Sequence, residues 1–324
     1  MMGPKRSRVR LRGFEIAVIV LAATLISCTT HQPVLRKESA MGDKIELRPY
    51  IWDGPYSEMR PQGATPHDPG LCADARAPWM KDGDRLILRT SEIVGYDTGY
   101  FYDDHFPTQE LETRGKHYRH LPFGWNRSRT RDKLSASCTV PGKGWFGLTL
   151  TSHEDTIDIE MAVRNDTTNR MEYVDWYFCA VGFESPTIGD RSLERTQVFD
   201  GSELRTLAQI SGVGMGEEMV LVDGPGGADG FVPNLHASHK QADTRAMVPL
   251  VMIGTVDGTH TAALGFERAH TIFSSAGNKC FHADPFFGSG LDPGEERKMK
   301  GRLYLMEGTP EDALARFRRE FKIP

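Results

Sequence analysis

Residues 145–164 read WFGLTLTSHEDTIDIEMAVR, and apolar side chains alternate with polar ones through most of this stretch. In its second half the apolar positions are Ile157, Ile159, Met161 and Val163. Successive side chains of a strand point to opposite faces, so this period of two predicts a strand over 155–164 with one buried face and one hydrated face. Phe146, Leu148 and Leu150 alternate in the same way over 145–151. We therefore expect the two segments to form a β-hairpin.

Further strands follow along the chain. Residues 171–183 read MEYVDWYFCAVGF, which is apolar at both parities and predicts a strand covered on both faces. Apolar runs at 246–253 and 261–266 flank an Asp-Gly turn and predict a second hairpin. A long strand is expected at 296–306, and shorter ones at 44–51, 84–90, 132–140, 194–209 and 217–222.

The C-terminal residues carry the one strong helix signal. Thr309 suits the N-cap, Pro310 suits the first helical position, and two acidic residues follow in the first turn. Leu314, Phe317 and Phe321 form one apolar stripe, so a helix over 310–321 should pack against a sheet. The pattern as a whole predicts an all-β, antiparallel domain with a single C-terminal helix.

The first 28 residues predict an exported lipoprotein. Five basic residues lie within positions 5–12, and an apolar run of about a dozen residues follows at 16–26, fewer than the roughly 20 of a membrane-spanning helix. Such a segment is typical of a secretory signal peptide. It ends in Leu25-Ile26-Ser27-Cys28, which resembles the bacterial lipobox. The alternatives are an ordinary signal peptide with a chance cysteine and a short membrane anchor.

This resemblance implies a signal peptide over 1–27, a polar tether over 28–43 and one domain over 44–324, held to a membrane by lipid on Cys28. Thr29 follows Cys28 where an Asp would favour the inner membrane, so we expect an outer-membrane lipoprotein facing the periplasm or the cell surface. Removing the net +4 of residues 1–27 changes the net charge from -5 to -9. A nucleic-acid partner is not expected, because phosphates require a basic surface.

Four cysteines remain beside Cys28, namely Cys72, Cys138, Cys179 and Cys280. An oxidising compartment permits disulfides among them, with three pairings if all are bridged. A buried thiol is the other interpretation for Cys179, which lies in an apolar segment. The sequence has no Cys-x-x-Cys motif, so a cysteine zinc site is not expected. We predict no cofactor and no metal ligands, although the candidate site below would also suit a divalent metal.

The strand rhythm of 145–183, with its Val163-Arg164-Asn165-Asp166 turn entry, and of 246–306 resembles the galactose mutarotase-like supersandwich. That fold occurs in aldose epimerases and as a major domain of many polysaccharide lyases and glycoside hydrolases. The resemblance covers about a third of the chain and implies an antiparallel β-supersandwich with a saccharide as ligand. The epimerase pattern of an Asn-His pair before an aromatic-rich segment is not present. The catalytic His and Glu of the epimerases are therefore not assigned to positions of this chain.

The densest group of polar side chains lies at 265–284 and comprises Glu267, Arg268, His270, Asn278, His282 and Asp284. Residues i and i+2 of a strand share a face, so Asp284 is expected to orient the imidazole of His282. Such a pair suits acid–base catalysis on a sugar, and it also suits two ligands of a metal. The alternative is a loop histidine capped by a nearby aspartate.

A second group of aromatic and histidine side chains lies at 100–120 and includes Tyr102, His105 and His120. His117 and His120, like His236 and His239, are three residues apart, and a strand would separate them. The simpler interpretation is therefore that these histidines are solvated loop residues and not metal ligands. Arg127, Arg129 and Arg131 alternate and would line one strand face, which could hold uronate or sulfate groups or simply face water.

The sequence thus favours a membrane-tethered, carbohydrate-active epimerase, lyase or hydrolase. The candidate catalytic residues are His282, Asp284, Glu267, Arg268, His105 and His120, and the candidate substrate-binding residues are Tyr102, Trp125, Arg127 and Asn278. His282 is expected to be the acid or base, with Arg268 holding a substrate oxyanion or carboxylate. The alternative is a non-catalytic carbohydrate-binding or envelope-structural lipoprotein. A binding protein would expose an aromatic platform from Trp52, Tyr56, Trp79 or Trp125.

Overall fold

In the computed structural model, the hairpin predicted from residues 145–164 lies within one large β-sheet. β7 (Gly144–Ser152) pairs antiparallel with β8 (Thr156–Asn165), so that Leu148 lies opposite Met161 and Leu150 opposite Ile159. All the apolar side chains predicted to point inward from these two strands are buried. The period of two in the sequence is therefore confirmed as the inner face of this sheet.

The structure describes residues 43–50, 72–97, 99–103, 125–182, 185–211, 218–228, 240–275 and 279–324, which belong to one compact unit, Met41–Pro324. Within these ranges, the sheet containing the hairpin, sheet B, has nine strands in the order β11-β10-β14-β15-β18-β8-β7-β6-β5. Its other strands are β5 (Asn126–Arg127), β6 (Lys133–Val140), β10 (Thr196–Phe199), β11 (Leu204–Thr206), β14 (Leu250–Gly254), β15 (His260–Phe266) and β18 (Glu296–Glu307).

The second sheet, sheet A, has the order β1-β2-β3-β9-β17-β16-β12-β13, with β4 paired to β3. Its strands are β1 (Glu46–Tyr50), β2 (Cys72–Arg76), β3 (Leu86–Tyr96), β4 (Gly99–Asp103), β9 (Met171–Val181), β12 (Glu218–Leu221), β13 (Lys240–Gln241), β16 (Ala269–Ser275) and β17 (Cys280–Leu291). Except for the short β12–β13 pair, the paired strands of both sheets are antiparallel. The predicted fold class, an antiparallel β-supersandwich, is confirmed.

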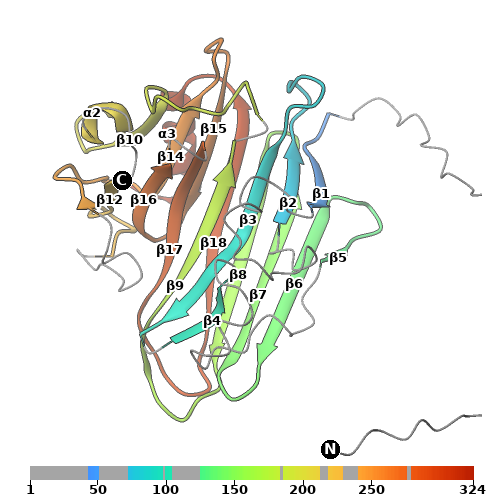
Figure 1. Ribbon diagram of the computed structural model, residues 1–324, viewed down its shortest axis with the longest axis vertical. Helices are drawn as coiled ribbons and strands as arrows, with labels where there is room; N and C mark the ends of the chain where they lie inside the picture. Colours follow the sequence, from blue (N-terminus) through green and yellow to red (C-terminus); the bar gives the residue numbers. More distant parts are fainter. Residues whose placement is uncertain are drawn as a thin grey trace, which may run out of the picture. The chain divides into compact units, whose positions relative to one another are not determined.

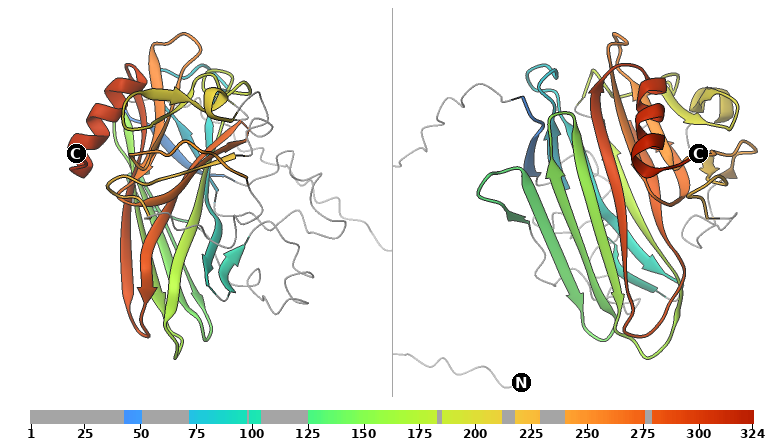
Figure 2. Two further views of the ribbon diagram at one scale, coloured as in Figure 1. Left: turned by 90° about the vertical axis from the view of Figure 1, so that its left-hand side faces the viewer. Right: turned by 180° about the vertical axis from the view of Figure 1, so that it is seen from behind.

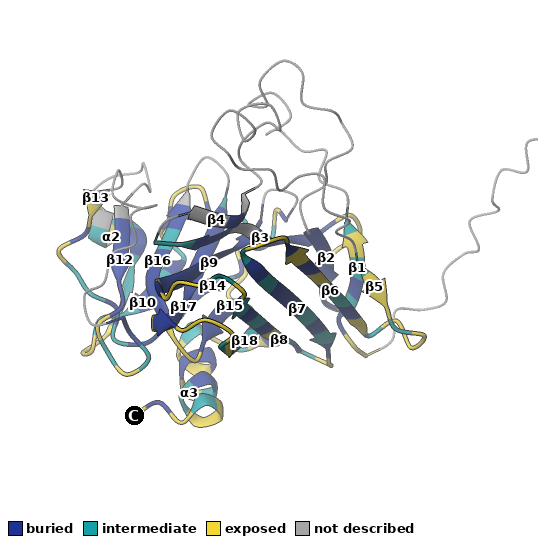
Figure 3. Cartoon of the chain, turned by 90° about the horizontal axis from the view of Figure 1, so that it is seen from below, coloured by how far each residue is buried: buried dark blue, intermediate teal, exposed yellow. Residues whose placement is uncertain are grey.

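The two sheets stack face to face, with α3 on the side of sheet B that points away from sheet A (Figures 1 and 2). In Figure 3, β9 and β17 of sheet A are coloured as buried along most of their length, and their burial patterns show buried residues at both parities. Trp176 of β9 is fully buried between the sheets, where its ring meets Phe146 edge-on at 5.5 Å. Packing against sheet B therefore buries one face of β9, whereas the residues on its opposite face are buried by other contacts.

α3 (Pro310–Phe321) begins and ends where the sequence predicts. The side chain of Thr309 accepts from the Asp312 amide and the Asp312 carboxylate accepts from the Thr309 amide, which forms a capping box. Phe317 is fully buried and Leu314 nearly so, in a cluster with Leu250 and Met252 of β14. The helix thus covers the outer side of sheet B. Within the described residues, no helix is long and apolar enough to cross a membrane.

Two expectations about secondary structure were wrong. Residues 194–209 hold two short strands and a short helix, α2 (Leu207–Ser211), whose first turn is tied by hydrogen bonds between Thr206 and Gln209. The strand predicted at 246–253 begins only at Leu250. The polar stretch at 265–284 is largely strand, as the pairing of His282 with Asp284 assumed, and these two side chains face away from sheet B.

Candidate functional site

The outer face of sheet A, which points away from sheet B, carries buried polar groups on its two central strands. Cys179 of β9 lies opposite His282 of β17, and Asp175 lies opposite Phe286. Facing residues of an antiparallel pair project to the same side, and so do residues two apart along a strand. The outer face therefore carries Tyr173, Asp175, Tyr177 and Cys179 from β9, and Cys280, His282, Asp284 and Phe286 from β17.

His282 and Asp284 form the pair that the sequence predicts. Nδ1 of His282 lies 3.4 Å from Oδ1 of Asp284, and Thr271 of β16 donates its hydroxyl to Oδ2 of Asp284 at 3.0 Å. Both residues are buried, with His282 6% exposed and Asp284 fully covered. Burial alone would lower the pKa of His282, but the neighbouring Cys280 and Asp284 together outweigh burial and raise it. The two side chains therefore lie side by side on the outer face, and the orienting role of Asp284 stays a prediction.

Asp175 is a buried acid that the sequence analysis did not single out. Its side chain is fully covered, and within the described residues no hydrogen-bond donor reaches either carboxylate oxygen. Burial, and then the negative charge of Asp284, raise the pKa of Asp175 to about 7. A single acid in the interior of an otherwise apolar strand was the signal that could have identified it, because an uncompensated carboxylate is costly to bury.

Aromatic and imidazole rings lie beside these acids. His270 of β16 is buried at a bulge in the β16–β17 pairing, with its ring 6.3 Å from Tyr177 and edge-on to Phe286 at 6.2 Å. Ala228, from the segment that follows β12, packs against Tyr173 and Phe286. The outer face at this point is therefore covered by a described part of the chain.

Glu267 and Arg268 are in the turn between β15 and β16, and both are exposed. Glu267 accepts from the backbone amide of Lys300 in sheet B, so its carboxylate is held at the other sheet. Arg268 places its guanidinium 5.4 Å from the ring of Phe286, at the margin of the outer face. Both residues also line a surface hollow of about 560 Å³ together with residues of 223–227. Arg268 therefore lies near the site, whereas Glu267 points elsewhere.

The described residues predicted to bind substrate hold parts of the fold together. Trp125 donates its indole N–H to the carbonyl of Cys72 at 2.7 Å, and Arg127 donates to the carbonyl of Leu47 at 3.3 Å. The predicted row of three arginines on one strand is wrong. β5 ends at Arg127, and a turn follows in which Arg131 has a positive φ of 62°.

The remaining predictions fall outside what the structure describes. Cys28, His105, His120 and Asn278 lie outside the described residues, as do the pairs His117/His120 and His236/His239. Tyr102 lies in β4, of which only the backbone is described at that position. Their roles stay predictions.

Comparison with solved structures finds chains of related architecture at low identity. A galactose mutarotase-related enzyme from Lactobacillus acidophilus is 10% identical with a TM-score of 0.40, over 73% of this chain and 91% of that chain. A ligand-free α-N-acetylgalactosaminidase from Bifidobacterium bifidum is 12% identical with a TM-score of 0.41, over 78% and 36%. An aldose epimerase homologue from Caenorhabditis elegans is 11% identical with a TM-score of 0.32, over 74% and 96%.

No protein-family model and no curated protein sequence matches this chain. At this identity and these TM-scores, no residue role is transferred from the solved structures.

Proposed function

We propose that this chain is a carbohydrate-active enzyme that moves protons on a sugar, with its site on the outer face of sheet A. The observation that carries this proposal is Asp175, a fully buried acid whose pKa is raised to about 7 beside a second buried acid. A carboxyl group with a pKa near the working pH can both release and accept a proton, as general acid–base catalysis requires.

The neighbours of Asp175 give the site its shape. Asp284 adds a negative charge next to Asp175 and lies 3.4 Å from His282, while Tyr177, His270 and Phe286 provide rings on the same face. Rings of this kind can stack against the apolar C–H surface of a sugar, and Arg268 at the margin could hold a substrate carboxylate or oxyanion. Asp175 thereby takes the acid–base role that the sequence analysis assigned to His282.

Access to Asp175 requires movement. Asp175 is fully covered, and Ala228 packs onto Tyr173 and Phe286 at the same face, so a substrate reaches the acid only after residues that cover this face move. The described tryptophans expected in a binding platform are engaged within the fold. Trp79 donates to the carbonyl of Leu305 and stacks on His260 at 4.3 Å, and Trp125 donates to Cys72. These contacts favour an enzyme over a shallow aromatic lectin.

The test is turnover by the full chain on a panel of neutral and uronate-containing oligosaccharides. Anomer exchange, release of reducing ends and unsaturated-uronate absorbance would be followed in parallel. We expect one of these products with the wild type, and a rate at least about 100-fold lower with Asp175→Asn, because the proton-transfer group is removed.

Glu172→Gln is the matched control, since Glu172 is an exposed carboxylate on the same strand. It should keep wild-type turnover. Absence of product on every saccharide, or equal rates for Asp175→Asn and the wild type, would show that this face does not catalyse proton transfer on a sugar.

We also propose that Cys28 tethers the protein outside the cytoplasm, on the basis of the basic, apolar and lipobox-like segments at 5–28. In a bacterial host, the full chain should fractionate with membranes and carry lipid on its N-terminal peptide by mass spectrometry. Cys28→Ser should appear in the soluble fraction without lipid. Membrane retention of Cys28→Ser at the wild-type level would contradict the lipid anchor.

A further inference from the structure

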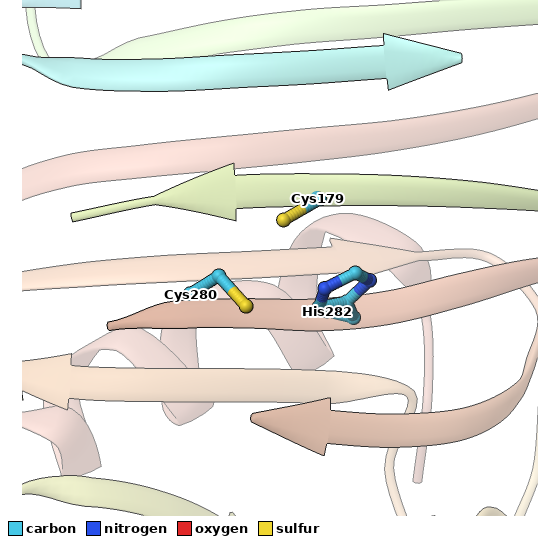
Figure 4. Close-up of side chains that lie close together, drawn as sticks. All are labelled: Cys179, Cys280 and His282. Atoms are coloured by element: carbon cyan, nitrogen blue, oxygen red, sulfur yellow. The ribbon is translucent and has the colours of Figure 1, made fainter. Parts of the chain in front are cut away.

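We propose that Cys179, Cys280 and His282 form a binding site for a thiophilic metal ion, Zn²⁺ or Cu⁺. The two cysteine Sγ atoms and a ring nitrogen of His282 all lie within 4.8 Å of one another (Figure 4). Two thiolates and one imidazole are ligands that both ions prefer. This site goes beyond the proposed function, because binding of a metal ion requires no saccharide.

The strand geometry explains why these three side chains meet. Cys280 and His282 are two apart on β17 and so share its outer face, and Cys179 lies directly opposite His282 on β9. Ligand atoms around a tetrahedral zinc lie roughly 3.3–3.8 Å apart, given bonds of about 2.0–2.3 Å. A separation of up to 4.8 Å therefore has to shrink by only about 1 Å, which side-chain rotation can supply.

The surroundings match those of known metal-binding histidines and cysteines. Neither cysteine is in a disulfide, and both are buried, at 2% and 3% exposure. Asp284 lies 3.4 Å from Nδ1 of His282, and such a carboxylate orients a metal-bound imidazole and increases its basicity. Arg89 of β3 lies opposite Cys179 in the pairing of β3 with β9.

The charge balance also favours a bound cation. Two thiolates and Zn²⁺ sum to zero, so the three ligands and the zinc ion together bury no net charge, and with Cu⁺ they carry one negative charge. Three protein ligands leave the fourth position of a tetrahedral zinc open, as in catalytic zinc sites, whereas Cu⁺ is satisfied by three ligands. A cysteine metal site was not expected from the sequence, because the chain has no Cys-x-x-Cys motif and these two cysteines come from strands that are far apart in sequence.

The test uses the full chain, reduced and stripped of metal, and measures binding of Zn²⁺ alone, Cu⁺ alone and Co²⁺ as a spectroscopic probe. We expect about one ion per chain and, with Co²⁺, the near-ultraviolet charge-transfer absorption of thiolate ligands. Cys179→Ser and Cys280→Ser should each weaken binding at least about 10-fold and reduce that absorption, and Asp284→Asn should weaken it about 10-fold through His282.

Two variants serve as controls. Cys138 lies on β6 in sheet B, so Cys138→Ser should leave affinity and absorption unchanged. Asp175→Asn should also bind metal normally, which separates this site from the proposed catalytic acid. Competition between Zn²⁺ and Cu⁺ identifies the preferred ion.

Three outcomes would overturn the metal site. They are binding of none of the three ions by the reduced wild type, a Co²⁺ spectrum without thiolate absorption, and an affinity unchanged by both cysteine variants. The first two use the wild-type chain, so the test does not depend on whether a variant folds.

Discussion

The free energy of unfolding of the wild-type protein should fall more steeply between pH 5 and pH 8 than that of its Asp175→Asn variant. The pKa of Asp175 is raised from 3.8 to about 7 by burial and by Asp284. Between these two values the folded chain binds a proton that the unfolded chain has released, so stability decreases as the pH rises. Below pH 3.8 this loss is absent, and above about pH 7 it is complete.

The magnitude follows from the size of the shift. Three pKa units correspond to about 4 kcal/mol in total, of which roughly 2–3 kcal/mol is expected between pH 5 and pH 8. Urea unfolding of both proteins at these two pH values measures the difference directly. Asn cannot titrate, so the variant retains only the pH dependence of the other groups.

Glu172→Gln is again the control, because it removes an exposed carboxylate from the same strand. Its stability should follow the wild type across the pH range. If the free energy of unfolding changed with pH in the same way for Asp175→Asn and the wild type, Asp175 would have the same pKa in the folded and unfolded chains. It could then not be the near-neutral acid of the proposed site.

Trp176→Ala should be the most destabilising single substitution in the core between the sheets. The ring is fully buried against Phe146 and Phe287, and its indole N–H donates to the carbonyl of Thr90 at 2.6 Å. Truncating a buried tryptophan costs about 3–5 kcal/mol from lost burial and the cavity that remains. Thermal and urea unfolding should both show the loss.

Trp176→Phe separates the contribution of the buried ring from that of the indole hydrogen bond. It keeps most of the apolar ring and loses the indole donor, so a cost of about 1–2 kcal/mol is expected. A loss below about 1 kcal/mol for Trp176→Ala would mean that the sheets do not pack through this residue. Because Trp176 and Asp175 project from opposite faces of β9, the two substitutions also test the two covered sides of one strand independently.

Parts of the candidate site were predictable from sequence because they depend on local geometry. His282 and Asp284 are two apart on one strand, so a period of two suffices to bring them together. Glu267 was expected with them, yet it lies in a turn where the Lys300 amide holds it at sheet B. The orientation of the Glu267 side chain depends on its contact with sheet B, and the residues around Glu267 in the sequence do not encode that contact.

The sequence by itself determined the elements whose patterns are complete within about 20 residues. The β7–β8 hairpin follows from the alternation at 145–164, and α3 follows from its capping residues and apolar stripe. Only the tertiary structure decided which distant residues meet. Asp175 joins Asp284, and Cys179 joins Cys280, across about 100 residues of chain, because β9 and β17 are neighbours in sheet A. Which strands distant in sequence become neighbours is decided by packing of the whole core, and so no local pattern could specify that β9 pairs with β17.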